Sequence, residues 1–546
     1  MKKQNVLKRL GALGVTMCLL VGSLVGCGNT DPKSESSSAG SKVSEESKSS
    51  EESKVTEENK EVVELILVGL GTEPAEGYDA LYEALDALTI PELGVKVRIQ
   101  TLAWGEEGTK IPLAVAGGEA DMIINGPWAS FLDYAGKNAF LDVAPYLETY
   151  PDLVDLYDET VGTGFLESQK IDGKLFGFNQ ITNKKAVDGN GMLYRQDLID
   201  EWGLKDITDF ASLEAYLYTA KDNGYQYITM DSRISFFVWE MMYKDEYKNL
   251  TASGNFNGLN YIVAPIDDPY NPMYIWETEE FENVCKIVEK WYNDGIIKSD
   301  VLSASIVDGH ILFSEDVVPA EICGTVNGFV SSYSVAALTA HPEWKLDFIP
   351  YHMLEDNKDY PWGLVLPSVG NETLITISAL SEHPDESMAF IHKALTDERY
   401  ARLMNYGVEG VHYTVENGVA TKNPDNKMGL STGFANYQHN YDKSYVNDEF
   451  KATYEKRDAE FLKKMNEGGV IENPYMGFKF DKTTVEAEFA NMENVESEYA
   501  IPLMCGVLQS SVEKDLETLK SMMDKAGAAE YMAEFQKQLS AFAANK

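Results

Sequence analysis

The first folded stretch of the chain alternates apolar runs with a helical pattern. VVELILVGLG (Val62–Gly71) ends in glycines, which predicts a buried strand that opens into a loop. A helical pattern follows from about Tyr78 to Leu88, and Pro91 is expected to break it. VKVRI (Val95–Ile99) then alternates apolar and polar residues, as a second strand does. This order of strand, helix and strand is the strongest constraint on the fold.

A second helix and a third strand extend the pattern. TKIPLAVAGG predicts a helix that stops at Gly117 and Gly118, and Ala120–Ile124 predicts the strand. Strands that alternate with helices predict an α/β fold, with a mostly parallel sheet covered by helices on both faces. Ligands of such sheets bind beyond the carboxyl ends of the strands. Here those ends carry Gly69–Thr72, Trp104 and the loop Asn125–Trp128.

The amino-terminal segment has the layout of an export signal. Its positive head contains Lys2, Lys3, Lys8 and Arg9. Leu10–Val25 is an uncharged apolar run of 16 residues, shorter than the roughly 20 needed to cross a bilayer as a helix. Gly26 and Cys27 follow it and resemble the bacterial lipobox, in which cleavage precedes the cysteine and the thiol carries a lipid. Residues 1–26 are therefore expected to be a signal peptide. The alternative is an ordinary secretory signal with a chance cysteine.

Residues 27–60 are expected to be a lipidated cysteine and a disordered tether. Gly28–Lys60 is almost entirely Ser, Glu and Lys, with no aromatic residue, so it cannot bury enough apolar surface to fold. A flexible coil of 33 residues spans on the order of 30 Å. The folded body would then be held at the extracellular face of the cell membrane. A phosphorylated or partner-binding tail is the alternative interpretation.

The charge of the chain excludes several partners. The formal charge is −42, and removal of the four cations in the signal makes it −46. Such an acidic body is repelled by nucleic acid and by anionic lipid, so membrane contact would require the lipid anchor alone. At 44% apolar residues, the 546-residue chain can bury a large core and is long enough for more than one domain. No coiled-coil or repeat pattern is present, so a monomer is expected.

The cysteines and histidines give no metal or redox motif. Cys285, Cys323 and Cys505 remain after the signal and the anchor are set aside, and they show no CxxC spacing. Cys285 lies on the apolar face of FENVCKIVEKWY, which favours a buried free thiol over a disulfide or a metal ligand. The seven histidines are scattered. No metal or cofactor is expected, and a calcium site is disfavoured because no EF-type spacing occurs.

Several segments in the same order carry a family resemblance. They are the lipobox, the tether, GGEADMIINGPW, IDGKLFGF (Ile171–Phe178), GMLYRQDLIDEWGL (Gly191–Leu204), KWYNDGIIKSD (Lys290–Asp300), the segment Ser381–Val415, NPYMGFKFDKTTVEAEFA (Asn473–Ala490) and AGAAEYMAEFQKQLSAF (Ala526–Phe542). The series resembles the extracellular solute-binding proteins of ABC importers. It is most similar to the sugar-binding group, in its large lipoprotein branch from Gram-positive bacteria.

This resemblance implies a two-lobe clamp of the periplasmic-binding-protein type, with ligand held in a cleft between lobes joined by crossing strands. Lobe 1 would comprise residues 61–171 and 366–415. Lobe 2 would comprise residues 172–365, completed by residues 416–546 with the carboxyl-terminal helices. Ile171–Asn179 and Trp362–Ile377 are then the expected crossings. A hairpin in an ordinary domain is the alternative for the first of these.

A sugar ligand needs aromatic planes for its C–H faces and polar groups for its hydroxyls. From the resemblance, the aromatic candidates are Trp104, Trp128, Trp239, Trp362 and Phe478, although any one of them alone would more often be a core residue. The polar candidates are Asn125, Glu240 and Glu321, because amides and carboxylates accept hydrogen bonds from hydroxyls. No catalytic residue is expected.

The resemblance thus implies a protein that captures a carbohydrate, expected to be an oligosaccharide, and delivers it to the permease subunits of an ABC transporter. Three alternatives stay open. The clamp could bind peptides, which also use Trp and Tyr, or it could serve a membrane sensor instead of a permease. A cell-surface enzyme acting on glycosides is the third, since paired carboxylates cannot be located from sequence alone. The sequence has no HExxH, GxxxxGK[ST] or GxGxxG motif.

Overall fold

The computed structural model describes most of the chain after residue 61. The described residues are 62–72, 78–102, 106–126, 129–181, 187, 189–225, 227, 234–243, 247–249, 262–303, 309–357, 364–365, 373–423, 429–431, 436–441, 447–468, 470–471, 474–475, 478 and 480–545. The signal segment, Cys27 and the tether lie outside them. Residues 60–546 form one compact unit of the chain. None of the helices in the described ranges has the length and apolar composition needed to cross a membrane.

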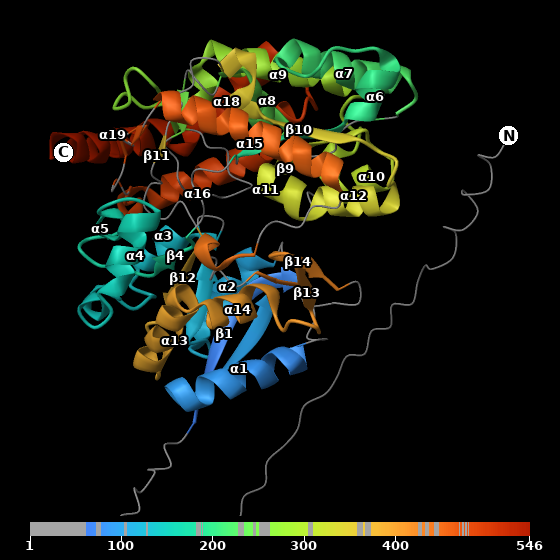
Figure 1. Cartoon of the computed structure of the whole chain (residues 1–546). Helices are drawn as coiled ribbons and strands as arrows, with labels where there is room; N and C mark the ends of the chain where they lie inside the picture. Colours follow the sequence, from blue (N-terminus) through green and yellow to red (C-terminus); the bar gives the residue numbers. More distant parts are fainter. Residues whose placement is uncertain are drawn as a thin grey trace, which may run out of the picture. The chain divides into compact units, whose positions relative to one another are not determined.

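The first group of elements surrounds a sheet that we call sheet A. Its strands are β1 (Val63–Thr72), β2 (Val95–Leu102), β3 (Met122–Asn125), β4 (Phe178–Asn179), β12 (Leu374–Ile377) and β15 (Gly429–Ser431). Its helices are α1 (Tyr78–Leu93), α2 (Glu107–Gly117), α3 (Phe131–Gly136), α4 (Asp152–Thr160), α5 (Phe165–Ser168), α13 (Pro384–Thr396) and α14 (Glu398–Tyr406). A hairpin of β13 (Tyr413–Glu416) and β14 (Val419–Lys422) follows α14. Figure 1 shows these elements together in blue, teal and gold.

Sheet A is mixed. β2 and β3 pair with β1 in parallel, and β12 pairs antiparallel with both β3 and β4. β15 pairs antiparallel with the end of β1. Each face of the sheet has its own apolar layer: α1, α4, α13 and α14 pack on one face, and α2 and α3 pack on the other. The predicted strands and the two-sided helical cover are therefore confirmed.

Helix α1 corrects one prediction. Pro91 was expected to break the helix, but α1 continues through it to Leu93. Proline removes one backbone donor, and here the loss falls in the last turn. The carboxyl-terminal end of α1 also has a tertiary contact. Arg399 of α14 contacts both carboxylate oxygens of Glu92, with Nη1 at 2.8 Å from Oε1. Thr89 also donates to the carbonyl of Val95 at 2.7 Å, which ties the helix to β2.

The second group of elements surrounds a smaller antiparallel sheet, sheet B, in the order β10-β5-β9. Its strands are β5 (Asn190–Arg195), β9 (Ala320–Thr325) and β10 (Leu346–Pro350), and a second small sheet contains β6 (Tyr247–Asn249), β7 (Ile262–Pro265) and β8 (Met273–Tyr274). β11 (Leu364–Val365) pairs in parallel with β16 (Val470–Ile471). The helices are α6 (Gln196–Trp202), α7 (Phe210–Asp222), α8 (Ile234–Tyr243), α9 (Glu279–Asn293), α10 (Gly309–Ser314), α11 (Val326–Gly328), α12 (Ser334–Ala340), α15 (Asp448–Gly468), α16 (Glu486–Val495), α17 (Ile501–Met504), α18 (Val512–Ala526) and α19 (Ala528–Ala544).

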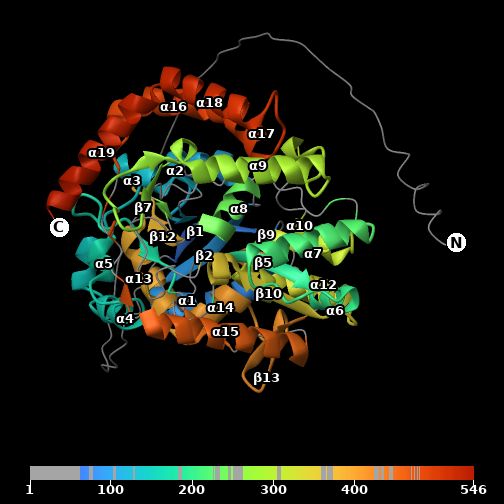
Figure 2. The ribbon, with the colours of Figure 1, turned by 90° about the horizontal axis from the view of Figure 1, so that it is seen from above.

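The sheet B group has one continuous core, separate from the two layers of sheet A. It runs from Val187 to Leu354 and resumes from Phe450 to Leu539. Figure 2 shows α16, α17, α18 and α19 as a red band beside α9. Cys285 of α9 is fully buried as a free thiol, and burial raises the pKa of that thiol. This confirms the prediction made from its helical face.

Gly177 lies where the chain passes closest to β12. A Cβ atom there would come within 2.4 Å of the carbonyl oxygen of Ile375, so no side chain fits without moving backbone. Gly173, four residues earlier, has a φ of +79°, a region that favours glycine. Leu175 and Phe178, between and after these glycines, are buried in the sheet A core. The segment is therefore fixed against sheet A by close backbone packing.

Replacing Gly177 with alanine should lower the free energy of unfolding by about 1–3 kcal/mol, because the new Cβ overlaps β12. Urea unfolding followed by circular dichroism measures this. Gly108→Ala is the matched control, since a Cβ atom there meets nothing within 4 Å. An equal effect of both substitutions would contradict the close-packing account.

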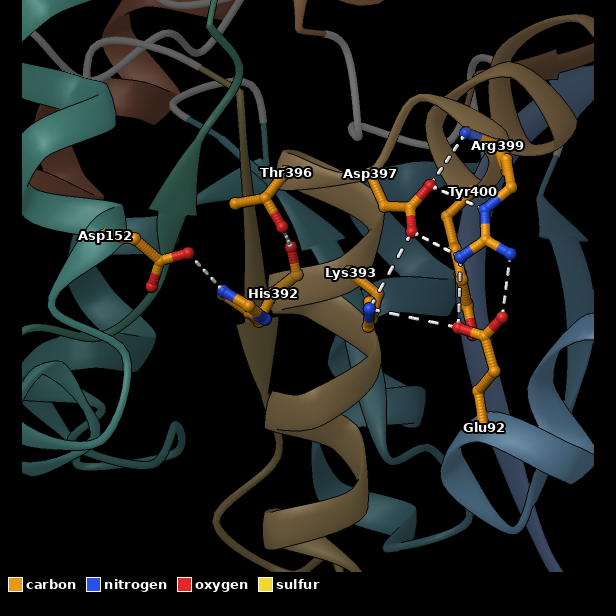
Figure 3. Close-up of polar contacts among 8 residues, drawn as sticks. All are labelled: Glu92, Asp152, His392, Lys393, Thr396, Asp397, Arg399 and Tyr400. Atoms are coloured by element: carbon orange, nitrogen blue, oxygen red, sulfur yellow. Dashed lines mark hydrogen bonds and ion pairs between the residues drawn. The ribbon is translucent and has the colours of Figure 1, made fainter.

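Charged groups join α1, α13 and α14 on one surface of the sheet A group. Figure 3 shows Arg399 contacting Asp397 and Glu92, with Lys393 near both carboxylates. The Arg399 guanidinium holds the pKa of Asp397 and the pKa of Glu92 below their usual ranges. In the same view, His392 Nε2 lies 2.7 Å from Asp152 of α4.

Arg399→Gln should lower stability at neutral pH, and this loss should shrink as the solution becomes acidic. A carboxyl group whose pKa is lower in the folded protein stabilises the fold above its ordinary pKa of about 4, and it loses this effect as pH falls through the folded pKa. Urea unfolding of wild type and variant between about pH 7 and pH 3 measures the difference. Arg402→Gln is the control, because it leaves Glu92 and Asp397 paired with Arg399. A difference that stays constant across this range would argue against the ion pairs.

Candidate ligand-binding site

Asn125 ends β3 at the carboxyl edge of the parallel strands, as the sequence predicts. Its side chain is fully buried, and its Oδ1 accepts the N–H of Gly126 at 2.7 Å. Its Nδ2 has no hydrogen-bond partner among the described residues. The carbonyl of Gly126 accepts from Ala129 N at 3.1 Å and from Phe131 N at 3.2 Å. The turn out of β3 is thus bonded directly to the start of α3.

Asn179 repeats this environment on β4. Asn125 and Asn179 both stand opposite Leu374 of β12, so all three side chains point to the same face of sheet A. Two strand spacings separate the asparagines, which is roughly 10 Å. Asn179 is also buried, and its Nδ2 also lacks a partner among the described residues. Two amide donors therefore face the α2 and α3 side of the sheet without acceptors among the described residues.

The sheet B group supplies the predicted carboxylates. Glu240 of α8 is buried, and its Oε2 accepts from Asn190 Nδ2 at 2.6 Å at the start of β5. Asn357 Nδ2 donates to the Glu240 carbonyl at 2.8 Å and fixes that turn of the helix. Glu321 lies on β9, where its Oε1 accepts the N–H of Cys323 at 3.0 Å. Both carboxylates are thus oriented by neighbouring donors.

The aromatic candidates are placed only in part. Trp239 is buried on α8, with its ring centroid 5.5 Å from that of Tyr243. Phe478 packs against Phe535 and Phe542 of α19, at centroid distances of 5.6 and 5.4 Å, which makes it part of the sheet B core. Trp104, Trp128 and Trp362 lie outside the described residues.

Sequence reasoning missed Asn179 and Asn190. Asn179 was included only as the end of a crossing segment. Its candidate role depends on its pairing with Leu374 of β12, and a pairing between residues so far apart in the chain cannot be predicted from local sequence. Asn190 had a local signal, because it stands between Gly189 and Gly191 at the start of a strand. Within the described ranges, no three His, Cys, Asp or Glu side chains gather where they could hold a metal ion.

The candidate residues comprise buried amide N–H donors on the sheet A group and buried carboxylates on the sheet B group. Amide groups donate to oxygen atoms, and carboxylates accept from hydroxyl groups. Neutral groups rich in hydroxyls satisfy both needs at once. A group with a strong negative charge would meet Glu240 and Glu321 unfavourably.

The comparisons agree with the fold. The bacterial extracellular solute-binding protein family matches residues 83–426, and a domain of unknown function (DUF3502) matches residues 474–544. The chain therefore belongs to the bacterial extracellular solute-binding protein family. Its fold is the two-lobe α/β clamp of periplasmic binding proteins, as the sequence predicts. The sheet A group corresponds to one lobe and the sheet B group to the other.

Individual relatives are distant but extend over most of the chain. A carbohydrate ABC transporter substrate-binding protein of Streptococcus pneumoniae is 19% identical over 555 residues, 99% of each chain. The polygalacturonan/rhamnogalacturonan-binding protein YtcQ of Bacillus subtilis is 20% identical over 411 residues, 73% of each chain. The crystal structure of the N-glycan transport solute-binding protein NgtS of Streptococcus pneumoniae matches with a TM-score of 0.66 and 17% identity, covering 88% of this chain and 99% of that chain.

Replacing Asn179 with leucine should leave the stability of the ligand-free protein unchanged or raise it by up to about 1 kcal/mol, because a buried amide without a partner costs desolvation energy. Asn436→Leu is the matched control. Asn436 is equally buried, but it donates to Leu395 O at 2.8 Å and accepts from Gln438 N at 3.1 Å, so its loss should cost about 2 kcal/mol. Urea unfolding measures both. A large loss in Asn179→Leu would show that its amide is already satisfied.

Proposed function

We propose that the protein captures a carbohydrate, in particular an oligosaccharide, outside the cell and delivers it to the permease subunits of an ABC transporter. The observation that carries this proposal is the match over 99% of both chains to a carbohydrate ABC transporter substrate-binding protein. Structures with similar folds include NgtS in complex with Man1GlcNAc and with Man5GlcNAc. The family and these relatives are binding proteins rather than enzymes, and no catalytic role is proposed for any residue.

The proposed binding surface uses both lobes. Asn125 and Asn179 would donate from lobe 1, while Glu240 and Glu321 would accept from lobe 2. The aromatic planes would come from Trp104, Trp128, Trp239 and Trp362, while Phe478 is a core residue. Closure of the lobes would bury the sugar, and the closed surface is what a membrane partner reads. Ligand must favour the closed state by several kcal/mol for this switch to be decisive.

Our proposal for the lobe boundaries is supported by the packing of the described residues. The sheet A core takes in Ile181 and is flanked by Tyr437, and the sheet B core begins at Val187 and resumes at Phe450. We therefore assign residues 62–181 and 373–441 to lobe 1, and residues 187–357 and 447–545 to lobe 2.

The proposed location is the extracellular face of the cell membrane. The signal in residues 1–26 would direct export, and a lipid on Cys27 would anchor the body through the tether. The negative charge of the chain leaves that lipid as the contact with the membrane. A monomer is proposed as the working form.

A thermal-shift panel on the whole chain tests the carbohydrate. The panel contains Man1GlcNAc, Man5GlcNAc, oligogalacturonides and alginate oligosaccharides, with short peptides as controls. One glycan class should raise the melting temperature in a saturable way, because a ligand that binds only the folded state at 100 times its Kd stabilises it by about 2.7 kcal/mol. The glycan should be recovered uncut after several hours.

Variants connect the result to the site. Asn179→Leu should weaken binding of the active glycan at least about tenfold, because a buried donor to the ligand is lost. Asn494→Leu, an exposed substitution on α16, should bind as wild type does. A shift with peptides alone would keep the clamp and reject the sugar, while cleavage of a glycan would replace transport with an enzyme activity.

A further inference from the structure

The segment matched to the domain of unknown function is built into lobe 2. Residues from Tyr475 to Leu539 contribute to the sheet B core. Tyr475 donates through its hydroxyl to Pro269 O at 2.6 Å, and Tyr274 donates to Ala528 O at 2.6 Å. We call residues 474–544 the carboxyl-terminal module. Because it shares the lobe 2 core, it moves with that lobe.

One side chain of this module reaches the other lobe. Lys482 Nζ lies 2.9 Å from Asp133 Oδ2 on α3, and both side chains are partly shielded, at 26% and 37% exposure. The ammonium also stands over the Phe489 ring, 4.1 Å from its centroid. This cation–π contact lies within the module and orients the Lys482 side chain. The ammonium group therefore loses little conformational entropy when it pairs with Asp133 on α3.

The surroundings of this ion pair are acidic. Burial raises the pKa of Glu493 on α16; Lys482 opposes this effect and Asp133 adds to it. Burial also raises the pKa of Tyr531 on α19, and the charges of Asp133 and Glu493 raise it further. Lys482 therefore pairs with Asp133 on the other lobe, and its charge also lowers the pKa of Glu493 on its own lobe. An ion pair in such a setting is screened less by solvent than one on an open surface.

We infer that Lys482 and Asp133 are positioning residues through which the carboxyl-terminal module holds the ligand-binding turn of lobe 1. α3 is bonded to the turn that leaves Asn125, because Ala129 N and Phe131 N both donate to Gly126 O. A displacement of Asp133 would therefore also move the turn after Asn125, because α3 joins the two. The module would favour the arrangement of lobes in which the pair is formed. If the lobes separate, Lys482 keeps Glu493 as a neighbouring anion within its module, while the Asp133 carboxylate loses its partner.

Hydrogen–deuterium exchange on the ligand-free whole chain tests the contact without any sugar. Lys482→Met keeps the packing on Phe489 and removes the charge, and Asp133→Asn removes the partner charge. Each single variant should speed amide exchange in α3 about fivefold, the low end of coupling between sites. The double variant should show no further increase, because both substitutions remove the same interaction. Lys482→Arg keeps the positive charge, so amide exchange in α3 should stay as slow as in the wild type.

Lys537→Met is the matched control, since its ion pair with Glu534 lies within α19 alone. Faster exchange in α16 and α19 without a change in α3 would overturn the inference, because Lys482 would then support only its own module. An additive double variant would overturn it as well.

The ligand part of the inference rests on the proposed function. With the glycan found in the panel, Lys482→Met should bind about fivefold more weakly than wild type. If no glycan binds but α3 exchange responds, the proposed function fails while the contact between the lobes stands. If a glycan binds and α3 exchange is unchanged, the inference fails and the function stands.

Discussion

Lobe 1 depends on the hydrogen bonds that β12 makes between β3 and β4. Thr376 of β12 also donates through its hydroxyl to the carbonyl of Ile123, a residue 253 positions earlier, at 2.8 Å. Without β12, strand β3 would expose an unpaired edge, and the buried backbone groups of β3 and β4 would lack partners. The whole of lobe 2 up to Asn357 is inserted before this strand. The position of Asn125 and Asn179 is therefore set by a segment far from both in sequence.

The polar groups of the candidate site share a physical logic. Two buried amides on lobe 1 have N–H groups without acceptors in the part of the chain that the structure describes, and the carboxylates on lobe 2 are oriented by donors from their own lobe. Free donors inside a protein carry a desolvation cost, which a suitable ligand can relieve. Oriented acceptors lose little entropy when a hydroxyl arrives.

The sequence predicted the local elements of lobe 1 well and their long-range partners poorly. Alternation and glycine punctuation were enough for β1, β2, β3 and the end of α2, where Gly118 has a φ of +68°. Pro91 misled the prediction of α1, because a tertiary ion pair from Arg399 supports the helix end and local propensity cannot report it. Asn179 was missed for a related reason, since its role follows from its register with Leu374. For the site, residue types near strand ends were predictable, but convergence between segments was not.

The buried cysteines have a consequence for the lifetime of the folded protein outside the cell. Cys285, Cys323 and Cys505 are free and buried, and the raised pKa of the Cys285 thiol keeps it in the unreactive protonated form. Oxidants attack the thiolate, so these sulfur atoms react only when the fold opens. In an oxidising medium, the rate at which the protein loses its thiols thus reports how often lobe 2 unfolds. A molecule that opens too often would acquire wrong disulfides and could not refold, so durability in this protein is a matter of slow opening as well as of equilibrium stability.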